Sequence, residues 1–346
     1  MSTAPAVDRP ALQRAVTAQA GRATPGTDDM AAYLDRQVDD ASHREVVGPL
    51  LNGSGASGVV LLHGEEVAAW GDPDIPEMAF SATKSFVALV AGVAFDRGLL
   101  RPSQPVVEVL DLEELQHGPA RQITWQHLLQ QTSQWRGVLW GKPTDVDAQS
   151  LRERDEVHDV APGQGWAYND VRINLLTLAL TALLKAPLDE VLRKAALAPL
   201  GASASWSWHG YASSWLDVAD GRVPVVSGGA HWGGGLLISA RDLARVGQLH
   251  LTGGAHDGRQ LLSQEWLQRM WAPCAVKPEY GYLWWRNDTD KVWPGAPRTG
   301  RCARGNGGRH LLWIDPARDL VVVSRWGEDV HRTLREISAA VAVSRR

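Results

Sequence analysis

The chain has 346 residues, with 35 basic and 39 acidic side chains, a formal net charge of -4 and no run of basic residues. This length allows one large domain or two interleaved ones, and the charge lacks the phosphate-neutralising surface that nucleic-acid binding requires. The two cysteines, Cys274 and Cys302, form no CxxC pair. We therefore expect free thiols, no metal centre and a reducing, cytoplasmic environment.

The first 50 residues are interpreted as a polar helical arm, domain 1–50, to which the sequence assigns no role. The first 20 residues have no continuous apolar core and do not read as a secretory signal. Apolar stretches such as 86–95 and 175–184 fall well short of the roughly 20 residues that span a bilayer, so we expect no membrane association. A Gly-rich segment, 52–58, ends the arm.

Strands are expected first, then helices, then strands again. A β-hairpin over 59–63 and 67–70 turns at Gly64, and residues 81–97 predict a buried helix that Gly98 closes. Further helices are expected over 125–131, 171–184, 188–196, 240–251 and 330–343, and further strands over 280–285, 309–314 and 320–326.

This order predicts a sheet assembled from both ends of the chain, with a helical part inserted between them. We expect an α/β domain over 51–100 and 255–346 and a mostly helical subdomain over 101–254. A site is expected in the cleft between them.

Ser81 and Lys84 are three residues apart, so on a helix they share one face, where a neutral amine can take the serine proton. The alternative is a helix-capping serine with a solvated lysine. Lys84 precedes a wholly apolar helix, which conflicts with a solvated role. A desolvated lysine can act as a base, whereas an arginine cannot lose its proton.

Two further segments carry candidate chemistry. Tyr168-Asn169-Asp170 follows a turn-rich stretch, and a phenol beside a lysine can relay a proton to a leaving group. The alternative is a tyrosine that packs its ring at an interface. Gly305-Asn306-Gly307-Gly308 lets backbone N–H groups approach a ligand, and the N–H groups of Ser81 and Gly308 can form an oxyanion hole. A plain flexible loop is the alternative.

The order of these three motifs resembles that of the penicillin-recognising serine hydrolases: class C β-lactamases, D-Ala-D-Ala carboxypeptidases, family VIII esterases and 6-aminohexanoate oligomer hydrolases. The resemblance covers about residues 50 to 330, including 123–133 and 236–244. It implies an α+β, β-lactamase/transpeptidase-like fold with an antiparallel sheet flanked by helices, and no metal or organic cofactor. It also implies Ser81 as nucleophile, Lys84 as base and Tyr168 as proton relay, with Asp170, Asn306 and Gly307 in support.

Two departures bear on the substrate. Asp170 stands where β-lactamases usually carry Asn, and Gly305 stands where they carry the Lys or His that helps to hold a substrate carboxylate, although the neighbouring Arg304 can substitute. We therefore expect a carboxylesterase-like hydrolase of a small-molecule ester or amide. The alternatives are β-lactam, D-amino-acid peptide or short-amide hydrolysis with the same residues, and a catalytically degenerate member that binds a ligand.

The 16 tryptophans suggest an aromatic substrate pocket. Trp135, Trp166 and Trp232 lie in the proposed helical region and are expected to line it. The alternative for each is a place in the core. No nucleic-acid partner is expected, and the sequence assigns no oligomeric state.

Overall fold

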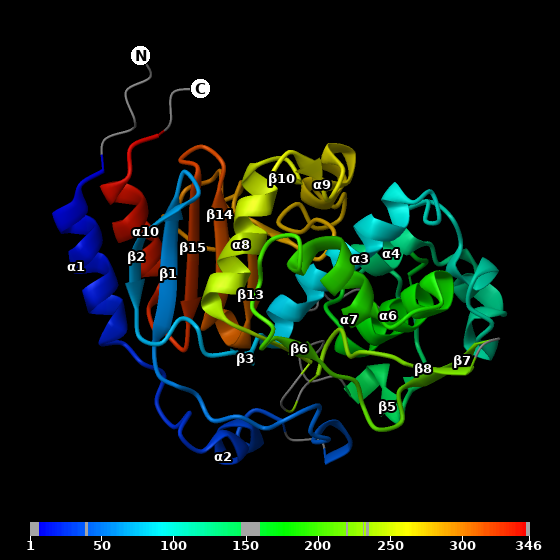
Figure 1. Cartoon of the computed structure of the whole chain (residues 1–346). Coiled ribbons are helices and arrows are strands. Elements are labelled where there is room, and N and C mark those ends of the chain that lie inside the picture. The colour runs from blue at the N-terminus through cyan, green and yellow to red at the C-terminus, as the bar shows by residue number, and fades with distance from the viewer. Residues whose placement is uncertain are drawn as a thin grey trace.

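A six-stranded antiparallel sheet forms one half of the molecule, in the order β12-β13-β14-β15-β1-β2 (Figure 1). The computed structural model describes residues 7–38, 41–146, 160–218, 221–230, 232 and 235–343. Because β1 and β2 come from the first part of the chain and the other strands from the last, the sheet joins its two ends, and the predicted α+β class is confirmed. The strands are β1 (Ser57–Leu62), β2 (Glu65–Trp70), β12 (Trp285–Arg286), β13 (Arg301–Gly305), β14 (His310–Asp315) and β15 (Leu320–Arg325).

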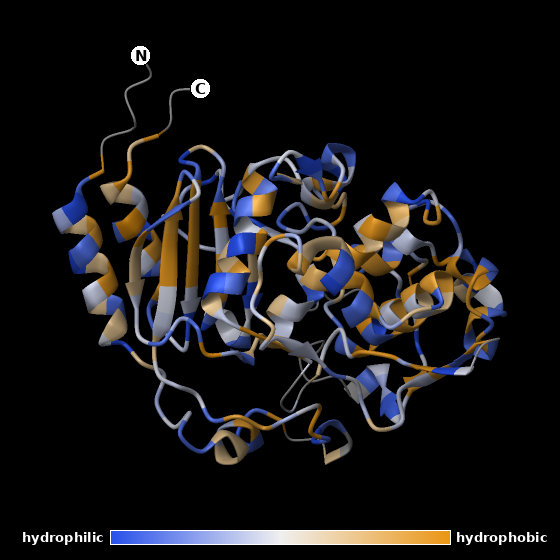
Figure 2. Ribbon diagram, viewed as in Figure 1, coloured by the Kyte–Doolittle hydropathy of each residue, from blue (hydrophilic) through white to orange (hydrophobic). Residues whose placement is uncertain are grey.

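Helices cover both faces of this sheet (Figure 1). On one face α1 (Arg9–Ala20) packs against α10 (Val330–Ala340) and against β2, and on the other α8 (Ala240–Leu251) packs against β1, β14 and β15. Every residue of β14 and β15 is buried, and Figure 2 shows the hydrophobic character of β1 and β15. Aliphatic strands of this kind are expected where both faces of a sheet are covered.

The predicted hairpin of β1 and β2 is confirmed. His63 and Gly64 both have positive φ angles, of 53° and 81°, as the two central residues of a tight type I′ hairpin turn require. The strands predicted over 309–314 and 320–326 are likewise confirmed as β14 and β15.

The prediction of a strand over 280–285 is wrong. Leu283 has a φ of 59°, the N–H of Gly281 bonds to the carbonyl of Trp284, and regular pairing begins only at β12. A Cβ on Gly281 would lie 2.1 Å from the Met270 carbonyl oxygen, so the chain turns sharply here against α9 (Gln264–Trp271). Strand β13 was not predicted, because its sequence, Arg-Cys-Ala-Arg-Gly, has no β-branched residue.

The other half of the molecule is largely helical and surrounds α3 (Thr83–Asp96). This helix is buried from Thr83 to Ala94 and packs against α6 (Asp170–Leu184), α7 (Leu188–Leu192), α9 and β13. A helix that is apolar on every side needs such a central place. The remaining helices of this half are α4 (Trp125–Leu129), α6 (Asp170–Leu184) and α7 (Leu188–Leu192), the last continued by a π-turn over Arg193–Leu197.

Short strand pairs complete the fold. They are β3 (Glu77–Met78), β9 (Leu236–Ile238) and β6 (Ser207–Trp208) in one small sheet, and the hairpins of β4 (Val138–Leu139) with β5 (Lys142–Pro143), β7 (Trp215–Val218) with β8 (Gly221–Pro224), and β10 (Ala255–His256) with β11 (Arg259–Gln260).

The N-terminal segment lies against the rest of the protein. Leu12 and Val16 of α1 are buried beside α10, and the second short helix, α2 (Met30–Asp35), buries Met30 and Leu34. The predicted domain boundaries stay a prediction. Over the described residues, no helix has both the length and the apolar character that crossing a membrane takes.

Candidate active site

Ser81 lies in a single 3-10 turn, Phe80–Ala82, between β3 and α3, two residues before the helix at whose N-terminus it was predicted. Phe80 has a φ of 49°, a left-handed conformation that is unfavourable for a non-glycine residue. Its ring packs on His310 and Trp326, at centroid distances of 4.9 and 5.5 Å. Aromatic packing therefore holds the strained turn that presents Ser81.

Lys84 occupies the first turn of α3, and its Nζ donates a 3.0 Å hydrogen bond to Ser81 Oγ. The amine also forms an ion pair with Asp170 and lies 4.8 Å from the centroid of the Tyr168 ring. Only 1% of Lys84 is exposed, so the alternative of a solvated lysine is wrong. Asp170 is the partner that a buried amine needs whenever it carries a charge.

The N-cap of α6 positions Tyr168 and Asp170. Asn169 caps the helix, because its side-chain oxygen accepts from the N–H of Arg172 at 2.9 Å. Its own N–H donates to Gln131 Oε1 at 2.7 Å, and its side-chain amide donates to the Thr144 carbonyl at 3.0 Å. These bonds fix the loop from both sides, so that Tyr168 and Asp170 both reach Lys84.

The third motif begins with the last residue of β13. Gly305 is the last residue of that strand, and a Cβ there would lie 2.9 Å from the backbone nitrogen of Ser81 and 2.7 Å from the Ala79 carbonyl oxygen. Only glycine lets the strand approach the Ser81 turn this closely. Asn306, Gly307 and Gly308 then form a tight turn with φ angles of 49°, 64° and 95°.

The three motifs meet around a cavity of about 180 Å³. Its walls include Ser81, Tyr168, Trp285, Arg304 and residues 305–308. The proposed oxyanion-hole residues Ser81 and Gly308 thus face one cavity together with Asn306 and Gly307. Lys84 and Asp170 lie behind it, buried next to Ser81.

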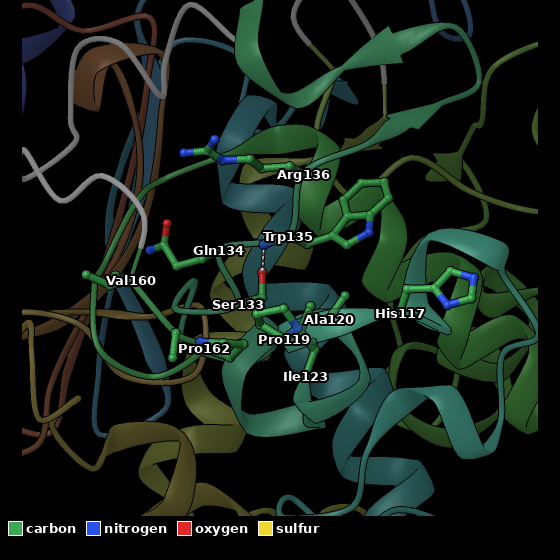
Figure 3. Close-up of a pocket in the computed structure, with 11 residues that line it drawn as sticks. His117, Pro119, Ala120, Ile123, Ser133, Gln134, Trp135, Arg136, Val160 and Pro162 are labelled. Carbon is green, nitrogen blue, oxygen red and sulfur yellow. Dashed lines mark hydrogen bonds between the residues drawn. The ribbon is translucent and has the colours of Figure 1, made fainter.

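The three tryptophans predicted for the pocket are not among the described residues of this wall. Trp166 is buried behind it, packed edge-on against Trp285 at 5.9 Å. Trp135 borders a separate cavity of about 390 Å³ and its ring points away from Gln134 (Figure 3). Trp232 packs in a cluster with Met30 and other buried residues near α2.

Trp285 is the wall tryptophan that the sequence analysis missed. It stacks on Tyr168, with 6.2 Å between centroids and 24° between planes, and the Arg304 guanidinium lies 4.0 Å from its ring centroid. Cation–π contacts of this kind hold an arginine in a defined place. No sequence signal distinguishes Trp285 from the other tryptophans, because its place depends on the pairing of β12 with β13, a strand that was not predicted.

His310 lies behind the site rather than in it. Its ring is buried between Phe80 and Trp326, and burial together with the nearby Arg325 and Arg309 lowers its pKa well below the usual value. It is therefore neutral and packs as an aromatic group. In the part of the chain that the structure describes, no cluster of three His, Cys, Asp or Glu side chains is arranged to hold a metal ion.

One family model and several known proteins match this chain. A family model described as Beta-lactamase matches residues 43–326. The chain is 26% identical over 294 residues to the 6-aminohexanoate-dimer hydrolase of Paenarthrobacter ureafaciens. The aligned region covers 73% of this chain and 67% of the relative.

Solved structures share the fold at low sequence identity. A D-stereospecific amidohydrolase from Streptomyces sp. matches with a TM-score of 0.61 and 16% identity, over 97% of this chain and 100% of that one. A protein from Bacteroides dorei described as a putative β-lactamase matches with a TM-score of 0.61 and 18% identity, over 83% of this chain and 94% of that one.

Proposed function

The chain belongs to the β-lactamase family of hydrolases, and from this premise we propose that it hydrolyses a small ester or amide through an acyl-enzyme on Ser81. The observation that carries the proposal is the 3.0 Å hydrogen bond from Lys84 Nζ to Ser81 Oγ beside an open cavity. A buried amine in contact with a serine hydroxyl is the arrangement that activates such a nucleophile.

In the proposed reaction Ser81 Oγ attacks the carbonyl carbon and its proton passes to Lys84. The Asp170 carboxylate beside Lys84 neutralises the charge that the amine carries while it holds this proton. The backbone N–H groups of Ser81 and Gly308 bind the oxyanion, and Tyr168 relays a proton to the leaving alcohol or amine. Water then attacks the acyl group and releases the acid, which regenerates Ser81.

The cavity of about 180 Å³ suits a small acyl group. Gly305 supplies no side chain where β-lactamases carry a cation for the substrate carboxylate, although Arg304 lies in the same wall. For this reason we place a carboxylesterase-like activity ahead of β-lactam hydrolysis.

Short-amide hydrolysis is the second candidate. It is favoured by the similarity to a protein named 6-aminohexanoate-dimer hydrolase and by the shared fold with a D-stereospecific amidohydrolase. Both candidates use the same acyl-enzyme and differ only in the leaving group.

An acyl-donor panel tests the proposal. Purified protein is incubated with short p-nitrophenyl esters, short linear amides including D-amino-acid amides, and nitrocefin. A fluorophosphonate adduct is detected by intact mass and located by mass analysis of proteolytic peptides. We expect ester turnover, a phosphonyl adduct on Ser81, and a fall in kcat/KM of at least about 10³-fold in Ser81→Ala. Full activity of Ser81→Ala would reject the proposal, and failure of every donor to acylate Ser81 would favour a degenerate, ligand-binding member.

A further inference from the structure

The short helix α2 lies outside residues 43–326, which the family model matches, yet it packs against the site. Asp29 caps it through a hydrogen bond to the N–H of Ala32, and Met30 and Leu34 are buried with Met78, Leu237 and Trp326. The Gly-rich segment 52–58 is also held, because the Ser54 N–H donates to Glu77 Oε1 at 2.7 Å. The helix is therefore capped and packed against the rest of the fold.

Tyr33 of α2 reaches the third motif. Its hydroxyl oxygen accepts a 2.8 Å hydrogen bond from the side-chain amide of Asn306, and both side chains are buried. Its ring packs edge-on against Trp326 at 5.6 Å, and the same Trp326 ring contacts Phe80, the residue before Ser81. Tyr33 thus touches the oxyanion-hole loop directly and the Ser81 turn through one aromatic ring.

The loop that Tyr33 contacts depends on its surroundings. Three successive residues, 306–308, have left-handed φ angles, and one of them is not glycine. Such a conformation persists only where neighbouring groups hold it. Trp293 limits the loop on the Gly308 side, since a Cβ on Gly308 would lie 2.6 Å from its ring. The hydrogen bond from the Asn306 side-chain amide to Tyr33 holds the other end of the loop.

We propose that Tyr33 is a positioning residue of the active site, which holds Asn306 so that the Gly308 N–H points at the oxyanion. The inference deepens the proposed acyl transfer and rests on it. Tyr33 touches neither substrate nor the reacting atoms, and acts only through Asn306. A misdirected donor weakens binding of the transition state more than binding of the substrate.

Tyr33→Phe tests the proposal, because it keeps the ring against Trp326 and removes only the hydroxyl. We expect kcat for a p-nitrophenyl ester to fall about 3- to 10-fold, the equivalent of one neutral hydrogen bond, with KM changed less than about twofold. Rates are divided by the fraction of protein that a fluorophosphonate titrates. The rate of phosphonylation of Ser81 should fall by a similar factor, because the phosphoryl oxygen uses the same N–H donors.

Tyr282→Phe is the matched control. Its hydroxyl donates a 3.0 Å hydrogen bond to Gln126, and neither residue lines the cavity beside Ser81, so its loss should leave kcat within twofold of the wild type. Asn306→Ala completes a double-mutant cycle: in that background Tyr33→Phe should have no further effect on kcat.

Three results would overturn the inference. If Tyr33→Phe is phosphonylated and turns over at the wild-type rate, Tyr33 does not position the loop, although the acyl-enzyme proposal stands. If its effect is equally large in the Asn306→Ala background, it does not act through Asn306. If wild-type Ser81 accepts neither acyl nor phosphonyl groups, the proposed function fails and the inference falls with it.

Discussion

At the residue scale, the site depends on a buried lysine whose amine contacts the Ser81 hydroxyl. Lys84 contacts a hydroxyl, a carboxylate and an aromatic face, and is 1% exposed. The choice of lysine over arginine matters here, because only the lysine amine can release and retake a proton. The sequence pattern alone left a solvated lysine open, and the burial of this side chain removes that alternative.

Lys84→Arg separates charge from proton transfer. The guanidinium can keep the ion pair with Asp170 but cannot act as a base, so we expect kcat/KM to fall by about 10³-fold, within the range for acid–base catalysis. The measurement is ester hydrolysis by protein with a native-like melting temperature. Lys194→Arg, a surface lysine paired with Glu190, serves as the control. Activity of Lys84→Arg within tenfold of the wild type would show that Lys84 is not the base.

At the element scale, the approach of β13 to the Ser81 turn brings two distant motifs together. Gly305 ends the strand where a Cβ would lie 2.9 Å from the Ser81 nitrogen. The Ser81 nitrogen and the Ala79 carbonyl oxygen, which the Cβ would approach to 2.7 Å, are both backbone atoms. An added methyl group must therefore move the strand or the turn. The geometry of the oxyanion hole therefore depends on the absence of a side chain at this position.

Gly305→Ala should consequently impair catalysis more than folding. A displacement of about 1 Å between the strand and the turn is expected to lower kcat/KM about 10²-fold. Gly21→Ala is the control, since its Cβ would meet its nearest neighbour at an ordinary 3.6 Å. Kinetics with p-nitrophenyl esters and thermal melts of both variants make the comparison. Wild-type kcat/KM in Gly305→Ala would mean that the close approach has no part in the reaction.

Elements with strong local signals were predictable from sequence, and those that depend on distant partners were not. The observed bounds of α8 coincide with those predicted, because apolar residues recur at helical spacing and Ser239 caps the first turn. By contrast, β13 is a strand because it lies between β12 and β14, and its residues have no strand preference of their own.

The same distinction applies to the site. Ser81 and Lys84 were predicted from their local spacing and Tyr168 from the order of the motifs, and the structure brings the three together. The pocket tryptophans were not found from such patterns, since the direction of an aromatic side chain on a loop is decided by tertiary packing. Tyr33 contacts Asn306 across 273 residues of sequence, from a helix of 6 residues that has little stability alone.

At the scale of the whole molecule, we expect stability in acid to depend in part on histidines that are buried in the neutral form. His250 of α8 is buried between Trp271 and Trp284, with ring centroids 5.4 and 4.5 Å away, and burial lowers its pKa to about 3. Neither ring nitrogen has a hydrogen-bond partner among the described residues. The folded protein therefore keeps this ring neutral where the unfolded chain protonates it.

The sign of the pH effect follows from this difference. The unfolded chain binds a proton at His250 near the ordinary pKa of 6.5, and the folded protein only near 3, so the stability that the neutral ring contributes is complete above pH 6.5 and declines as the pH falls toward 3. Across that window His250 should make the free energy of unfolding fall by about 1.4 kcal/mol per pH unit.

His250→Phe tests this expectation, because phenylalanine keeps an aromatic ring between the two tryptophans and cannot be protonated. Urea unfolding between pH 4 and 6.5 should show a slope of free energy against pH that is smaller than the wild-type slope by about one proton. His310, also buried and neutral, accounts for part of the slope that remains. His331→Phe, at an exposed position of α10, should leave the slope unchanged. An identical slope in His250→Phe and the wild type would mean that His250 takes up its proton without unfolding.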